Sequence, residues 1–122
     1  DRKAQANPSL VVHERDIATG QPGPHGGAGT TTAYPFFRDA PALGVEFRKR
    51  VLHKGAGIGL HPHHKDEIYY VLSGRGIYEL DGKAQEVGAG DAMLTRAGST
   101  HAIHQAGEED LVLLIMYGKK QE

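Results

Sequence analysis

The chain has 122 residues, with 14 Lys and Arg against 15 Asp and Glu, and a formal net charge of -1. This length fits one domain, and the balanced charge argues against a nucleic-acid partner and against an anionic membrane surface. The longest wholly apolar run, Leu111–Tyr117, is too short to span a bilayer, so we expect a soluble protein. The absence of cysteine excludes disulfides, thiolate metal sites and cysteine nucleophiles.

The composition leaves the compartment undecided. The chain begins with Asp1 and not with Met, which indicates a processed or trimmed product. Removal of an export signal is one explanation, and an artificial boundary is another.

The first 44 residues read as a loop-rich N-terminal arm. Glycine and proline crowd residues 20–29, which predicts a loop. The stretch Thr30–Phe37 is rich in threonine and aromatic residues and indicates a short strand, and Pro35 places that strand at a sheet edge. Two interpretations stay open: a flexible arm, or an arm that packs on the rest of the protein or on a second subunit.

From residue 45 onward, short runs of β-branched and aromatic residues alternate with glycine-containing breaks, the first at residues 55–59. Asp81-Gly82 is typical of a two-residue hairpin turn. The pattern predicts an all-β sandwich or barrel over residues 45–117, followed by a C-terminal tail at residues 118–122. The expected strands are Val45–Leu52, Glu67–Leu72, Gly76–Leu80, Ala84–Val87, Ala92–Thr95, His101–Gln105 and Leu111–Tyr117.

Histidine is the unusual residue, because five of the eight lie in two short clusters. His61 and His63 are two residues apart, so on an extended chain their side chains leave the same face, about 6.6–7 Å apart at the backbone. A turn at residues 64–66 would return the Glu67 carboxylate to that face, and His101 would have to come from across the barrel. Three imidazoles and one carboxylate suit Fe, Mn, Co, Ni, Cu or Zn, and do not suit calcium. We therefore expect one divalent transition-metal ion per chain.

The spacing of these residues resembles the first motif of the cupin superfamily: Gly, five residues, His-x-His, three residues, Glu, six residues, Gly. Every fixed position is matched, by Gly55, His61, His63, Glu67 and Gly74. The second cupin motif is matched in part, by Gly90, Gly98 and His101. Arg96 stands where that motif usually has proline, and Gln105 where it usually has asparagine.

The resemblance implies a small single-domain cupin. The expected fold is a double-stranded β-helix, which is a jelly-roll-like barrel, with one metal ion near its mouth. The expected metal ligands are His61, His63, Glu67 and His101. Small cupins commonly form homodimers, so we expect a homodimer whose other partner is a small-molecule substrate or ligand.

Strand alternation selects further candidates near the ion. If Glu67 and His101 point inward, Tyr69 and Gln105 share their faces. We take Glu67, Tyr69 and Gln105 as candidate catalytic residues, with plain core packing as the alternative for Tyr69. The charged residues 48–50 alternate along an expected strand. One that points inward could bind an anionic substrate, although such residues are usually solvated.

The other histidines give weaker signals. Alternation places His104 on the outer face of its strand, and His64 is expected in a solvated turn. His13, His25 and His53 have no partner that the sequence identifies.

Three functions are compatible with this pattern, because a fold does not fix a function. The leading hypothesis is a metal-dependent enzyme that acts on a small oxygenated substrate, either a sugar derivative or an organic acid, as an isomerase, lyase or dioxygenase. The alternative is a non-catalytic module that uses the metal to bind a small ligand. The third is a structural domain, stabilised by metal, whose arm mediates assembly.

Overall fold

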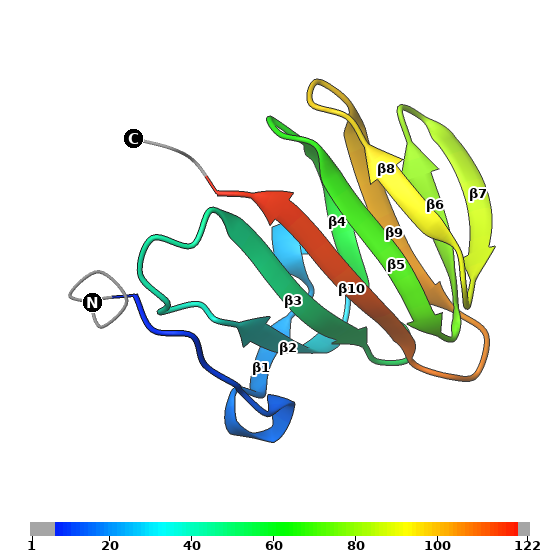
Figure 1. Cartoon of the computed structure of the whole chain (residues 1–122). Coiled ribbons are helices and arrows are strands. Elements are labelled where there is room, and N and C mark those ends of the chain that lie inside the picture. The colour runs from blue at the N-terminus through cyan, green and yellow to red at the C-terminus, as the bar shows by residue number, and fades with distance from the viewer. Residues whose placement is uncertain (1–6, 120–122) are drawn as a thin grey trace.

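The structure, a computed structural model, describes residues 7–119 and is almost entirely β (Figure 1). The predicted arm and tail are therefore described without residues 1–6 and 120–122. Within the described part, no helix is long and apolar enough to cross a membrane. The elements in chain order are η1 (Glu14–Asp16), β1 (Thr19–Pro22), η2 (Pro24–Gly26), β2 (Thr30–Phe36), β3 (Val45–Leu52), β4 (Gly57–Pro62), β5 (Glu67–Ser73), β6 (Arg75–Leu80), β7 (Lys83–Gly88), β8 (Ala92–Thr95), β9 (Thr100–Ala106) and β10 (Leu111–Gly118).

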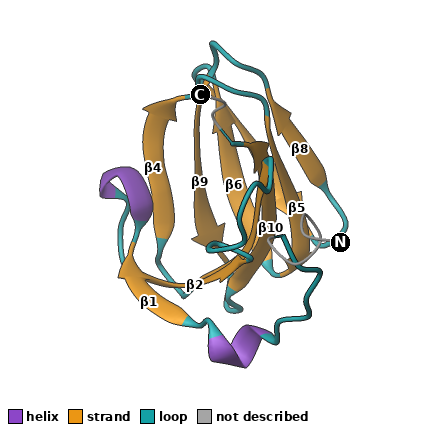
Figure 2. Ribbon diagram, turned by 60° about the vertical axis from the view of Figure 1, so that its left-hand side comes forward, coloured by secondary structure: helices purple, strands orange, loops and turns teal. Residues whose placement is uncertain are grey.

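The strands form two antiparallel sheets that face each other (Figure 2). One sheet has six strands in the order β1-β2-β3-β10-β5-β8, and the other has four in the order β4-β9-β6-β7. Neighbours in each sheet are mostly far apart in the sequence, as in a jelly roll. The predicted all-β, cupin-type barrel is confirmed.

The segment expected as an arm contributes two strands to the larger sheet. β2 pairs with β3 from Thr31 to Phe36, and β1 pairs with β2 only over residues 30–33. Pro35 lies beyond the part of β2 that pairs with β1. On that side of β2 no neighbouring strand needs a backbone donor at Pro35, which is consistent with proline having no N–H group. Of the two interpretations of the arm, packing on the barrel holds for residues 19–36.

All seven strands predicted between residues 45 and 117 are present, with ends shifted by at most one residue. The Asp81-Gly82 turn has positive φ at both residues, 49° and 86°, as a type I′ hairpin requires. Two predictions were wrong. β4 begins at Gly57, inside the break expected at residues 55–59, and β1 occupies part of the loop expected at 20–29.

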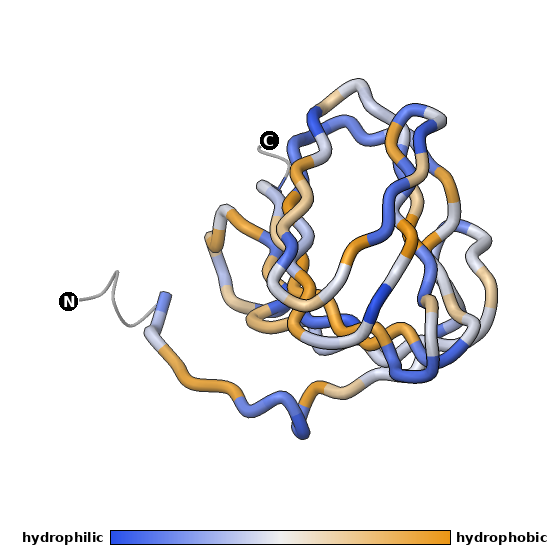
Figure 3. Tube along the Cα trace, turned by 90° about the vertical axis from the view of Figure 1, so that its right-hand side faces the viewer, coloured by the Kyte–Doolittle hydropathy of each residue, from blue (hydrophilic) through white to orange (hydrophobic). Residues whose placement is uncertain are grey.

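The core lies between the two sheets and follows the alternation of each strand. Along β5 the residues alternate between buried and exposed from Glu67 onward. Figure 3 shows hydrophobic and hydrophilic stretches interspersed along the chain. Leu113 and Ile103, from opposite sheets, are fully buried. This apolar layer fills the barrel beneath its more polar mouth, where the histidines lie.

Candidate metal centre

His61 and His101 occupy paired positions on neighbouring strands of the smaller sheet. The register between β4 and β9 shifts between Ile58 and His61, which marks a β-bulge. Strict alternation would place residues three apart on opposite faces, and the bulge brings both Ile58 and His61 to the interior. The bulge therefore aims His61 at His101, which is fully buried.

His63 and Glu67 reach the same place from the connection between β4 and β5. The loop before β9 holds this connection, because the His63 amide donates to Ser99 O (2.9 Å) and the Gly98 amide donates to His63 O (2.8 Å). The Asp66 carboxylate accepts from the Ala97 amide at 3.0 Å. Glu67 then begins β5 and is 5% exposed.

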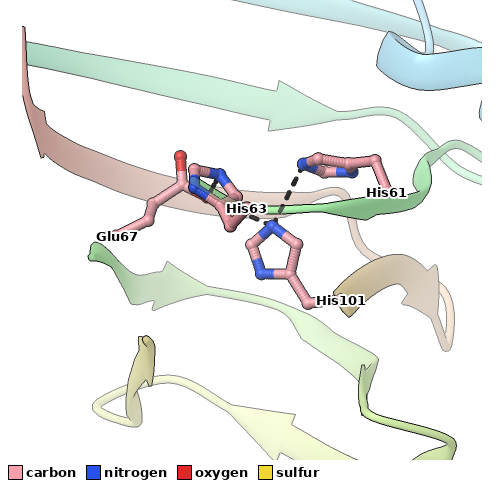
Figure 4. A group of neighbouring side chains, drawn as sticks. All are labelled: His61, His63, Glu67 and His101. Carbon is pink, nitrogen blue, oxygen red and sulfur yellow. Dashed lines mark hydrogen bonds and ion pairs between the residues drawn. The ribbon is translucent and has the colours of Figure 1, made fainter. Parts of the chain in front are cut away.

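The four predicted ligand side chains converge on one point (Figure 4). His61 Nε2 lies 3.2 Å from His101 Nε2. Glu67 Oε1 lies 2.8 Å from His63 Nε2 and 3.2 Å from His101 Nε2. One ligand atom from each residue lies within 4.8 Å of all the others. Ligands that are each about 2.0–2.2 Å from a common ion lie at separations of this size.

The Glu67 carboxylate gives an independent test of whether a cation fits here. Its Oε1 is buried and, despite the short distances to His63 and His101, has no partner in hydrogen-bond geometry within the described part of the chain. A buried carboxylate oxygen without a donor is costly. A divalent cation at the centre of the four ligands would satisfy this oxygen and balance its charge, so the residues fit a metal ion.

The outward-facing nitrogens of the three imidazoles are all engaged, which fixes the direction of the inner nitrogens. His61 Nδ1 lies 2.7 Å from Gly59 O, and His63 Nδ1 lies 3.0 Å from Lys65 O. Carbonyl oxygens only accept, so these Nδ1 atoms carry the proton and the Nε2 lone pairs point to the centre. His101 Nδ1 lies 2.7 Å from the Thr95 hydroxyl, which also contacts the Tyr78 hydroxyl.

The electrostatics of His61 favour its neutral, ligating form. Burial lowers the pKa of His61 below its usual 6.5, and the nearby imidazoles of His25, His101 and His63 lower it further, against an opposing effect of the bond to Gly59. A neutral imidazole is the form that binds a metal.

Tyr69 lies at the site, as strand alternation predicts. Its hydroxyl is 3.5 Å from His101 Nε2, and its ring stacks on the His101 ring with centroids 5.1 Å apart. Burial, and next the Glu67 carboxylate, raise the pKa of Tyr69 well above 10.0. Its hydroxyl is therefore protonated at neutral pH.

The structure does not bring Gln105 to this cluster. Its side chain is buried, as predicted, but its Oε1 accepts from the Gly55 amide at 2.8 Å. Its Nε2 donates to the carbonyls of Ala106, Gly107 and Glu109. Every polar atom of the Gln105 side chain thus bonds to backbone groups. Gln105 lies four residues along β9 from His101.

Three of the four ligand residues, His61, His63 and Glu67, line a cavity of about 310 Å³, and further basic side chains line it with them. Arg48 and Arg50 both line it from β3, while Lys49 points to the opposite face and pairs with Glu14. His25, which has no partner that the sequence identifies, also lines the cavity. A histidine in a glycine-rich turn carries no periodic signal, so only the folded contacts reveal it.

Arg50 is a buried guanidinium, 5% exposed. Its Nη1 donates to Gln21 Oε1 and Thr31 Oγ1, both at 2.9 Å and both neutral. Burial, followed by the neighbouring Arg48, lowers the pKa of Arg50 below its usual value. Arg48 pairs with Glu46 at 3.1 Å, but its Nε is buried and finds no partner among the residues that the structure describes. Positive charge and an unused donor therefore face the cavity beside the ligand cluster.

Together, fold and site define a double-stranded β-barrel domain with a His₃Glu group at its mouth that could hold a metal. The family model for the Cupin domain matches residues 49–117. The chain belongs to the cupin family, as its motifs predict.

Among known proteins, the chain is similar to an oxalate-binding protein of Thermotoga maritima, with 39% identity over 69 residues. That match spans 56% of this chain and 57% of that protein, and the chain spans about half the length of the curated relatives it matches. The crystal structure of a predicted oxalate decarboxylase from Thermotoga maritima has a TM-score of 0.82 and 30% identity, over 91% of this chain and 100% of that one. A polyketide cyclase from Streptomyces resistomycificus shares the fold, with a TM-score of 0.76 and 21% identity over 92% and 80% of the two chains.

Proposed function

We propose that this chain binds one divalent transition-metal ion through His61, His63, Glu67 and His101, and that the centre binds a small chelating organic acid of the oxalate type. The observation that carries the proposal is Arg50, a buried cation that has no acidic partner among residues 7–119 and lines the same cavity as His61, His63 and Glu67. The similarity to an oxalate-binding protein supports the same class of ligand.

The two arginines favour an anion over a neutral sugar. A buried charge without a counterion is costly, and a bound carboxylate would offset that cost. The guanidinium group is suited to carboxylates because its donors match their geometry. The unpartnered Arg48 Nε adds a donor on the same strand. A ligand with two carboxylates could coordinate the metal through its oxygens and also form an ion pair with the arginines.

The residues around the ligand cluster would have different roles in such a site. A divalent ion held by four protein ligands would offer its remaining coordination positions to ligand oxygens and polarise them. Thr95 and the carbonyls of Gly59 and Lys65 orient the three imidazoles. The buried apolar layer below, which includes Ile58 and Ile115, limits water at the floor of the cavity.

The three-nitrogen, one-oxygen donor set is compatible with Fe, Mn, Co, Ni, Cu or Zn. We propose one such ion per chain. Selection among these metals depends on their supply as well as on the ligands, since the affinity of a given site follows the same order for most proteins.

A second candidate function is catalysis on the bound acid, as in a decarboxylase, and Tyr69 is the observation that favours it. Decarboxylation replaces a carbon–carbon bond with a carbon–hydrogen bond and needs a proton donor at the reacting carbon. The Tyr69 hydroxyl is protonated and lies beside His101 Nε2. In this role Glu67 stays a ligand or acts as a base. Isomerase, lyase or dioxygenase chemistry on other oxygenated substrates is the wider form of the same proposal.

The test is calorimetric titration of the metal-loaded chain with oxalate, malonate and acetate, followed by chemical analysis of the acid. The proposal predicts that oxalate binds only to the metal-loaded form and more tightly than acetate, which has a single carboxylate. Recovery of unchanged oxalate after incubation with and without dioxygen supports the binding function, whereas release of CO₂ and formate supports catalysis. Equal binding to metal-free and metal-loaded chain contradicts the proposal.

We also propose a homodimer, with the outer face of β5, β8 and β10 as the contact. The outward side chains of these strands carry no charge, and several are large and exposed, namely Ile68, Tyr70, Leu72, Leu94 and Met116. A charged partner would find no complementary group there, whereas a second copy presents an equally apolar face. Light scattering after size-exclusion chromatography should give a dimer mass, and a monomer for Ile68→Glu.

A further inference from the structure

The turn that carries His25 is held against β4 by close glycine contacts. A Cβ on Gly23 or Gly27 would overlap the carbonyl oxygen of Gly57, and a Cβ on Gly59 would overlap the carbonyl oxygen of His25. The Gly57 amide also donates to Ala28 O at 3.0 Å. Only residues without side chains allow the two backbones to approach this closely. The glycines of the turn at residues 23–29 and of β4 therefore allow the turn to pack directly against the strand that carries His61.

This contact places the His25 ring flat on the His61 ring. The ring centroids are 3.6 Å apart and the planes differ by 9°. His25 adopts a left-handed backbone conformation, with φ 55° and ψ 38°, which is uncommon for a residue with a side chain. The stack and the turn therefore hold His25 in a conformation that it does not prefer alone.

The His61 ring is fixed on three sides as a result. Its Nδ1 bonds to Gly59 O, its edge meets the His101 ring at 68° with centroids 4.6 Å apart, and His25 covers a face. His61 is only half-buried, unlike the fully buried His101. Of these two paired imidazoles, His61 is the one whose ring depends on a covering group from outside the barrel strands.

The stacked arrangement also distinguishes His25 from a ligand. Because the two rings are nearly parallel, the nitrogen lone pairs of His25 run alongside those of His61 and do not converge with them on one metal ion. His25 is accordingly absent from the group of side chains whose donor atoms converge. It lies outside the segment that matches the Cupin domain, which begins at residue 49.

We infer that His25 is a positioning residue for the metal ligand His61, and that the glycine-packed turn at residues 23–29 delivers it. The inference rests on the proposed metal binding. His25 acts through the face of its ring, so an aromatic ring without nitrogen should replace it. Groups that orient metal ligands typically contribute tenfold to a hundredfold to metal affinity.

The first experiment measures Co²⁺ affinity by chelator competition, together with the Co²⁺ absorption spectrum, for His25→Ala, His25→Phe and His13→Ala. Both His25 replacements carry a Cβ and meet the same left-handed backbone, so they form a matched pair. His25→Ala should lower the affinity about tenfold or more and change the spectrum. His25→Phe should stay within about threefold of the unmutated chain, and His13→Ala, at a residue that does not line the cavity, should match it.

The turn is tested separately through its glycines. Gly27→Ala places a Cβ against Gly57 and should reduce the affinity as His25→Ala does, whereas Gly20→Ala, where a Cβ meets no atom within 4 Å, should not. Circular dichroism and melting temperature confirm folding of each variant. An unchanged affinity in His25→Ala would overturn the inference, and so would an equal loss in His25→Phe.

A readout without metal separates this inference from the proposed function. If the unmutated chain binds no Co²⁺, the proposed function fails, and the nitrogen NMR spectrum of the His61 imidazole still tests the positioning role. The metal-free unmutated chain and His25→Phe should show a single tautomer of His61 with the proton on Nδ1. His25→Ala should show averaging between the two tautomers, and one fixed tautomer in all three proteins overturns the inference.

Discussion

His61 and His101 are directly paired across β4 and β9, with their Nε2 atoms 3.2 Å apart, although 40 residues separate them in sequence. A bulge in β4 makes this possible by restoring His61 to the interior face after Ile58. Of the remaining two ligands, His63 lies in the connection that follows β4, and Glu67 begins β5. The centre thus depends on strand pairing more than on the local His-x-His sequence.

Replacing Thr95 by valine should weaken metal binding without removing a ligand. The Thr95 hydroxyl is the partner of His101 Nδ1, and valine keeps the shape while removing that partner. We expect a tenfold to hundredfold loss of metal affinity, as is typical when the group that orients a ligating histidine is removed. Isothermal titration with Co²⁺ measures this loss, and an affinity equal to that of the unmutated chain would show that Thr95 has no orienting role.

Replacing Arg50 by methionine should separate acid binding from metal binding. Hydrogen bonds to charged groups contribute about 1.5–3 kcal/mol, so oxalate affinity should fall roughly tenfold to a hundredfold. Metal affinity should be unchanged, because no Arg50 atom contacts the four ligands in the contacts described above. Stability should not fall, since the change removes a buried charge without a counterion.

The control for this substitution is Arg75→Met, on the outside of β6, where the Arg75 side chain pairs with Glu86 and is 58% exposed. Calorimetry of both metal-loaded variants with oxalate is the measurement. An equal change in the two variants would rule out a specific anion site at Arg50.

Gln105→Ala should lower stability and leave metal binding intact. The Gln105 side chain is buried and bonds to the backbone at Gly55, at Ala106 and at two residues of the loop after β9. Its loss leaves buried backbone groups unpaired, at a cost of about 1–3 kcal/mol each. Denaturant unfolding measures the loss, and metal analysis of the same variant checks the site. A normal stability with reduced metal content would restore Gln105 as a residue of the centre.

Stability should depend on the ionisation of Asp81 at acid pH. The Thr100 amide donates to its carboxylate at 2.8 Å and lowers the pKa of Asp81 below its usual 3.8, and the Ser99 side chain lowers it further. A folded-state pKa below the unfolded value gives stability that is present above about pH 4. This stability is lost as the pH falls through the folded-state pKa.

Asp81→Asn keeps a carbonyl acceptor and removes the charge, which isolates this effect. The difference in urea midpoint between the unmutated chain and Asp81→Asn should be largest near pH 6 and should narrow toward pH 3. A difference that is constant over this range would contradict the assignment.

Much of the fold follows from local pattern. Glycine breaks and alternating apolar residues locate seven strands, and alternation along β5 places both Glu67 and Tyr69 inward. The same pattern fails to predict β4, because glycines in this strand allow close backbone contact with the turn at residues 23–29 and do not mark a chain break. Composition alone does not distinguish these two uses of glycine.

The candidate site was likewise predictable only in part from local sequence pattern. Alternation correctly makes Gln105 face inward, but it gives no position along the strand. Four residues on β9 span about 13 Å, which moves Gln105 to the other end of the barrel from His101. His25 and the buried state of Arg50 depend on contacts with β4 and β2, which arise only when distant segments pair.

Metal analysis of the purified chain tests the central claim most directly. Mass spectrometry of the elements in the unmutated chain, in His101→Ala and in His104→Ala compares a buried ligand with an outward histidine of the same strand. We expect about one transition-metal ion per chain in the unmutated protein and in His104→Ala, and almost none in His101→Ala. The same metal content in His101→Ala as in the unmutated protein would contradict it.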